Sequence, residues 1–95
     1  MRVDLDTIEV AFAKIVARMR EAGADAVDLS DDFYWFIPRE ERYNPHAAPR
    51  NMTMGQLTDD WNEVRKIANG DAPPIAYSLC WLAAILTAAG ERSLT

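Results

Sequence analysis

Two carboxylates four residues apart are the side chains of this sequence best spaced for chemistry. Asp59 and Glu63 lie in the segment D-D-W-N-E, and this spacing places both on one face of a helix. Such a pair can hold Mg²⁺ when a substrate phosphate completes the coordination shell. However, the sequence offers no second helix with paired acids, and early-helix positions with a Glu63–Lys66 pair account for these acids without a metal. We therefore expect no metal site and keep Asp59 and Glu63 as the only candidates for one.

The other reactive side chains do not form a catalytic arrangement in the sequence. His46 is the only histidine, so a zinc site with two histidines is excluded, and no neighbouring residue would orient it as a general base. Cys80 lies in an apolar run, where a thiol behaves as a small buried hydrophobe. No glycine-rich phosphate loop and no G-x-S-x-G motif is present. The sequence therefore favours a protein that is not an enzyme, with no catalytic residue and no cofactor. The alternative is a small metal-dependent enzyme that combines helix carboxylates across a dimer interface.

Size and charge narrow the class of protein further. Ninety-five residues form one small domain, and 49% hydrophobic with 26% charged residues is typical of a globular chain. The net charge of −5 has the wrong sign for a protein that follows phosphate backbones, so we expect no nucleic-acid partner. An acidic chain suits a basic protein partner instead.

The sequence predicts a cytoplasmic protein. A single cysteine cannot form an internal disulfide, which fits a reducing compartment. Asp4, Asp6 and Glu9 interrupt the first residues before an apolar signal sequence could form. The uncharged stretch 72–90 begins with Ala-Pro-Pro, and the helix that remains is too short to cross a bilayer. We therefore expect no membrane partner.

Hydrophobic periodicity predicts a first helix from Asp6 or Thr7 to Ala22. Apolar residues recur at steps of three and four while charged residues fall elsewhere; the apolar positions are Leu5, Ile8, Phe12, Ile15 and Met19. Gly23 should end this helix, because glycine readily adopts the left-handed conformation that satisfies the last carbonyl groups.

A capping box predicts the start of the second helix. Thr53 would be the N-cap, and Gln56 would reach back to its amide. Met52 would pack on Leu57 as a hydrophobic staple. The Asn69-Gly70 pair should end this helix.

The third predicted helix covers about Ile75 to Ala89 and ends at Gly90. It is apolar on nearly every face, so it should be covered on several sides. In so small a chain, we expect either the aromatic segment described next or a second copy of the protein to cover part of it. A homodimer enters here as a hypothesis.

An aromatic strap, Phe33 to Ile37, lies in the long aperiodic segment between the first two helices. As a strand it would need a hydrogen-bonded neighbour, and we expect Val27 to Leu29, Arg2 to Leu5, or the strap of a two-fold related copy. The alternative is an irregular strap whose side chains fill the gap between helices. Whether the strap is core or dimer interface stays open at this stage.

The stretch from Arg39 to Arg50 is typical of an exposed loop, because it mixes charges with turn-forming residues. Binding residues concentrate on loops that a rigid scaffold holds in place. The predicted binding residues are Tyr34, Trp35, Arg39, Tyr43 and His46.

Three segments also carry a resemblance: D-D-F-Y-W-F-I-P, M-T-M-G-Q-L-T-D-D-W and P-I-A-Y-S-L-C-W-L-A-A-I-L. Together they resemble a group of small bacterial proteins of unknown function that share an aromatic strap ahead of a G-Q-L-x-D-D-W helix. The resemblance covers about Asp31 to Gly90. It implies a bacterial cytosolic protein with a mostly helical fold, and it implies no activity.

These observations predict a mainly α fold: a compact bundle of three helices, or four if a short extra turn forms, with the strap extended between the first two. The predicted function is a small acidic, non-enzymatic protein–protein interaction module, for example an inhibitor or immunity-type protein. Its partner would be another protein or a second copy of itself.

Overall fold

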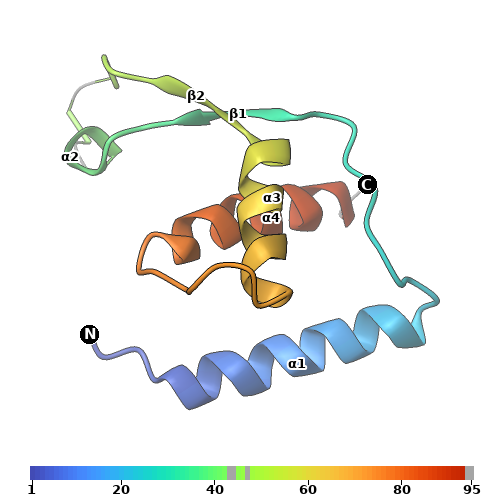
Figure 1. The fold of residues 1–95 in the computed structure, drawn as a ribbon. Helices are drawn as coiled ribbons and strands as arrows, with labels where there is room; N and C mark the ends of the chain where they lie inside the picture. Colours follow the sequence, from blue (N-terminus) through green and yellow to red (C-terminus); the bar gives the residue numbers. More distant parts are fainter. Residues whose placement is uncertain (43–44, 47, 94–95) are drawn as a thin grey trace.

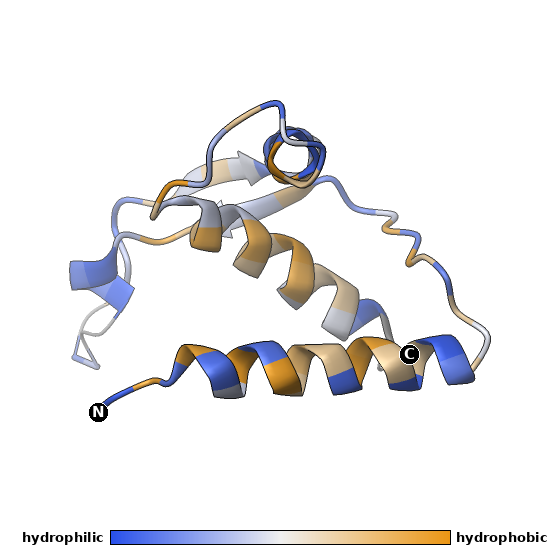
Figure 2. Cartoon of the chain, turned by 60° about the horizontal axis from the view of Figure 1, so that its bottom comes forward, coloured by the Kyte–Doolittle hydropathy of each residue, from blue (hydrophilic) through white to orange (hydrophobic). Residues whose placement is uncertain are grey.

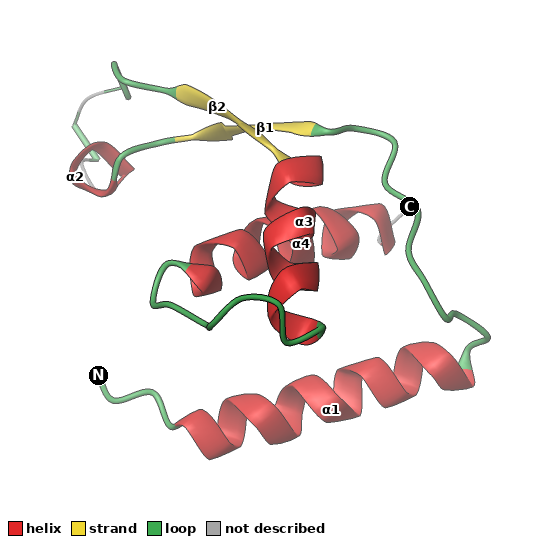
Figure 3. Cartoon of the chain, in the orientation of Figure 1, coloured by secondary structure: helices red, strands yellow, loops and turns green. Residues whose placement is uncertain are grey.

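The computed structural model describes residues 1–42, 45–46 and 48–93, which contain four helices and one two-stranded sheet (Figure 1). In chain order these are α1 (Leu5–Glu21), β1 (Phe33–Phe36), α2 (Arg39–Arg42), β2 (Thr53–Gln56), α3 (Leu57–Ala68) and α4 (Ser78–Ser93). Helices dominate, but the prediction of a mainly α helical bundle is wrong. Figure 3 shows instead an antiparallel hairpin above a pair of crossing helices, with α1 below them.

The first helix confirms the periodicity argument. Asp4 caps α1, because its carboxylate accepts a hydrogen bond from the Thr7 hydroxyl at 2.7 Å and one from the Asp6 amide at 3.3 Å. The bond from Thr7, more than those from the backbone, lowers the pKa of Asp4. Gly23 follows the helix with φ of +94°, the left-handed conformation predicted for it.

The neighbour of the aromatic strap is a segment that we expected to be helical. β1 pairs antiparallel with β2, so the two neighbours predicted within the chain, Val27 to Leu29 and Arg2 to Leu5, are wrong, and so is the alternative of an irregular strap. Thr53 is paired with Phe36 and is not a helix N-cap, and Gln56 is the last residue of β2. The backbone of the predicted capping box is used by the sheet ladder, and α3 therefore begins at Leu57.

Asp32 supplies the cap of α3 from across the hairpin. Its carboxylate accepts hydrogen bonds from the Thr58 amide and the Thr58 hydroxyl, both at 2.7 Å, and from the Gln56 amide group at 2.9 Å. Its carbonyl oxygen accepts a further bond from the Leu57 amide at 2.6 Å. A residue 26 positions before Thr58 thus satisfies the amides that a helix leaves open at its first turn.

The second and third helices of the sequence prediction correspond to α3 and α4, which cross and pack on each other. Gly70 follows α3 with φ of +79°, which confirms the predicted stop. α4 begins later than predicted, at Ser78, whose hydroxyl oxygen accepts a hydrogen bond from the Ile75 amide at 3.0 Å. It also continues through Gly90, which has no left-handed conformation. Cys80 is exposed on this helix, contrary to the expected buried position.

The core of the described chain is small. Leu57 is its only buried hydrophobic residue, at 6% exposure, and it lines cavities together with Tyr34 of β1 and with Ile85 and Ala88 of α4. The strongest contacts between elements join α3 to α4 and β1 to β2. α1 buries no residue, and an extended segment connects it to β1 (Figure 1). Within the described residues, no helix combines the length and apolar character that a bilayer crossing requires.

The cap of α3 should make stability depend on pH through Asp32. The hydrogen bonds from Thr58, then Gln56, lower the pKa of Asp32 below its ordinary value of 3.8 in the folded protein. A lowered folded-state pKa stabilises the fold above pH 3.8, and this contribution is lost as the pH falls through the folded value. We therefore expect Asp32→Asn to lower the urea midpoint at pH 7, with the difference from wild type shrinking below about pH 4.

Asp31→Asn is the matched control, because Asp31 is an exposed neighbour of the same type. Unfolding curves followed by circular dichroism between pH 7 and pH 2 would test both variants. Equal midpoints for the two variants at pH 7 would show that Asp32 does not cap α3.

Candidate protein-binding surface

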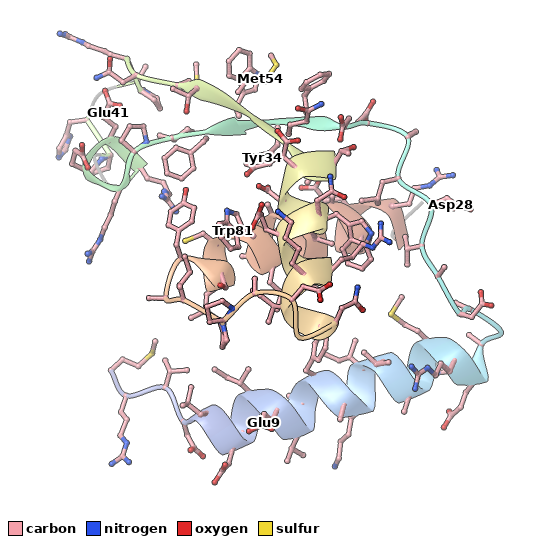
Figure 4. All side chains as sticks on the ribbon, in the orientation of Figure 1. Glu9, Asp28, Tyr34, Glu41, Met54 and Trp81 are labelled. Carbon is pink, nitrogen blue, oxygen red and sulfur yellow. The ribbon has the colours of Figure 1, made fainter. Side chains whose placement is uncertain are left out.

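The β1–β2 hairpin has one face turned toward the helices and one turned away. Side chains alternate along a strand, and directly paired residues share a face. Tyr34 is paired with Gly55, and Trp35 is paired with Met54. Tyr34 points toward the helices and Met54 points away from them (Figure 4). The hairpin therefore separates an inner face from an outer one.

Tyr34 anchors the inner face. Its hydroxyl donates a 2.6 Å hydrogen bond to the carboxylate of Asp60, which is only 8% exposed. Its ring lies directly over Gly55, where any Cβ atom would overlap with the ring. Burial, followed by the bond to Asp60, raises the pKa of Tyr34 well above its ordinary value. The hydroxyl therefore stays a proton donor, and the contact holds the hairpin against α3.

The outer face carries three large apolar side chains that are each more than half exposed. We call Phe33, Trp35 and Met54 the outer aromatic face; they are 58%, 61% and 58% exposed. Aromatic residues and methionine are enriched where proteins contact one another, and tryptophan is among the residues that most often dominate binding. This composition and exposure fit a protein-binding surface.

A second uncovered apolar surface lies on α1. The residues that predicted this helix are exposed: Leu5, Ile8, Phe12 and Ile15 range from 42% to 74%, and Met19 is half-buried. We call these five residues the α1 stripe. Apolar segments recur along α1 in Figure 2. The hairpin and α1 lie on opposite sides of the α3–α4 pair (Figures 1 and 3).

The total surface of the chain is larger than that of a typical folded monomer of the same mass. A monomer of 10.7 kDa should expose ~5,500 Å², whereas this chain exposes 8199 Å². Its radius of gyration of 15.3 Å likewise exceeds the ~12 Å typical of 95 residues. The exposed side chains include those of the outer aromatic face and all of the α1 stripe except Met19.

The structure distributes the predicted binding residues over several surfaces. Trp35 is exposed on the outer aromatic face, whereas Tyr34, its neighbour in sequence, is an inner anchor. Arg39, in α2, and His46 are both exposed in the connection between the strands. Tyr43 lies outside the described residues. Phe33 and Met54 lie on the same surface but were not among the predicted binding residues. Strand alternation places Phe33 on the same face as Trp35, so the sequence could have identified it. Met54 could be assigned to this face only once its pairing with Trp35 was known.

The connection between the strands is held by Glu41. Its carboxylate accepts hydrogen bonds from the Arg50 amide at 3.0 Å and the Asn51 amide at 3.1 Å. Arg42 donates to the Ile37 carbonyl oxygen at 3.2 Å and lies over the Phe36 ring, 5.7 Å from its centre. These contacts hold the connection between β1 and β2 through polar and charged side chains.

The candidate carboxylates lie in a polar cavity on another side of α3. Asp59 and Glu63 line a cavity of about 550 Å³, together with Asp60, Lys66 and Trp81 among others. Glu63 is paired with Lys66 at 3.1 Å, as the sequence predicts. Within the described residues, no group of three histidine, cysteine, aspartate or glutamate side chains is placed to hold a metal ion. The lining of this cavity therefore consists largely of charged and polar side chains.

No protein-family model, no curated protein and no solved structure matches this chain.

The packing of Tyr34 on Gly55 predicts a specific sensitivity to substitution. Gly55→Ala adds a Cβ atom where the Tyr34 ring lies, so the ring must move away from Asp60. We expect a loss of about 1–3 kcal/mol in the free energy of unfolding, measured by urea unfolding.

Gly90→Ala is the matched control, because a Cβ atom at Gly90 meets nothing within 4 Å and the residue lies inside α4. Alanine there should stabilise the protein by about 0.5–1 kcal/mol. If Gly55→Ala were as well tolerated as Gly90→Ala, the anchoring role of Tyr34 would be wrong.

Proposed function

We propose that this protein is a small acidic, non-enzymatic protein–protein interaction module of a bacterial cytosol. The observation that carries the proposal is the surface excess: about 2,700 Å² more than a monomer of this mass should expose. Two exposed apolar surfaces, the α1 stripe and the outer aromatic face, contribute to this excess, and exposed apolar patches are typical of sites that contact other proteins. The proposed module buries part of this surface against another polypeptide. One such polypeptide is a second copy of the chain.

The outer aromatic face supports a further contact with a different protein. Its residues are apolar and exposed, and the connection between its two strands carries the exposed polar residues Arg39 and His46. The net charge of −5 favours a basic partner, because opposite charges accelerate association and disfavour wrong partners. An inhibitor or immunity-type protein that binds a basic target is one form of this function.

The proposal predicts self-association in solution. Light scattering and sedimentation equilibrium of the wild-type protein, at several concentrations, should give a mass near 21 kDa, twice the 10.7 kDa of one chain. The dimer should resist 1 M NaCl if apolar contacts dominate, because salt screens charges and not hydrophobic burial. A mass of one chain at all concentrations would contradict the proposal.

A further inference from the structure

The α1 stripe has the spacing of a coiled-coil seam. Its five residues follow one another at steps of three, four, three and four, which is the heptad pattern of positions a and d. This pattern differs from the broader apolar face of a helix that packs on a globular core. α1 is 17 residues long and buries none of them against the rest of the described chain. Its seam is therefore formed, and four of its five residues, all but the half-buried Met19, are exposed.

The charges of α1 specify the direction in which a second helix can pair with it. The first half carries Asp4, Asp6 and Glu9, and the second half carries Lys14, Arg18 and Arg20. Only Glu21 interrupts this division, and it lies 3.9 Å from Arg18. A parallel copy would place acids beside acids and bases beside bases, whereas an antiparallel copy places opposite charges together. The helix dipoles also favour the antiparallel arrangement, because opposite ends then meet.

The surface that must be covered is as large as the interface of a permanent homodimer. Such interfaces bury about 2,000–5,000 Å² or more, summed over both chains, and the excess of about 2,700 Å² per chain amounts to about 5,400 Å² for two copies. The seam, from Leu5 to Met19, spans about 21 Å along the helix. The same patch on both copies then meets itself about a two-fold axis.

We infer that α1 is a self-association helix that pairs antiparallel with α1 of a second copy through the α1 stripe. Phe12, the central residue of the stripe, lies nearest the two-fold axis, and the acidic half of each helix lies beside the basic half of the other. This inference rests on the proposed function, because it names the partner of one uncovered surface.

Two matched substitutions test the seam. Ile15→Asp places a charge within the α1 stripe, and Val10→Asp places the same charge on the opposite side of the same helix, where Val10 is 55% exposed. Sedimentation equilibrium should show the dimer dissociation constant raised at least tenfold by Ile15→Asp and changed less than threefold by Val10→Asp. Neither should alter the tryptophan fluorescence, because α1 buries no residue of its own.

A distance measurement tests the direction. In a Cys80→Ser background, a spin label at Arg20→Cys should give a separation of at least ~24 Å across an antiparallel dimer, from eight residues of rise on each side of Phe12. A parallel pair would place these labels ~10 Å apart. A label at Ala13→Cys, next to the axis, should be close to its copy in either case and reports that the labelled protein is dimeric.

The outcomes separate the inference from the proposed function. A wild-type protein that stays monomeric would overturn both. A wild-type dimer that Ile15→Asp and Val10→Asp weaken equally would overturn the α1 pairing and leave the interaction module intact. A short distance between the labels at position 20 would overturn the antiparallel direction.

Discussion

The hydrogen bonds of Asp32 are the constraint on which the rest of the fold depends. β2 runs directly into α3, so no residue between the two elements is available to cap the helix. The cap must come from elsewhere in the chain, and Asp32, the residue before β1, supplies it with both its carboxylate and its carbonyl oxygen. This arrangement fixes the start of β1 at the start of α3, and the Tyr34–Asp60 bond fixes β1 again one helical turn later. Because the inner face is held at these two points, Phe33, Trp35 and Met54 must face outward.

The second constraint is the small number of residues. With Leu57 as its only buried hydrophobic residue, the described chain has a core that cannot also cover a 17-residue helix. α1 is nevertheless well formed, with a cap at Asp4 and a stop at Gly23. Local signals thus complete the helix, while most of its apolar side stays exposed within the described residues.

Local signals also decide which parts of the structure could be predicted from the sequence. The periodicity of α1 and the stops at Gly23 and Gly70 depend on residues close together in the chain, and those predictions are confirmed. The capping box at Thr53 is an equally clear local signal, but pairing with Phe36 overrides it. The partner of β1 lies about twenty residues away, so no local pattern reveals it. The inward position of Tyr34 depends on the same pairing, which is why it was expected on the binding surface beside Trp35.

The opposite placement of α1 and the hairpin has a consequence for any assembly built through α1. A dimer joined on one side of the α3–α4 pair carries two copies of the outer aromatic face, each on the side away from the joint. Such a particle is bivalent. Once one face has bound a target that is itself repeated, the second face binds at a high effective concentration, and avidity can exceed the affinity of either face by about 10²–10⁴. Pairing through α1 would then set how strongly the outer aromatic face, on the opposite side of the α3–α4 pair, binds a repeated target.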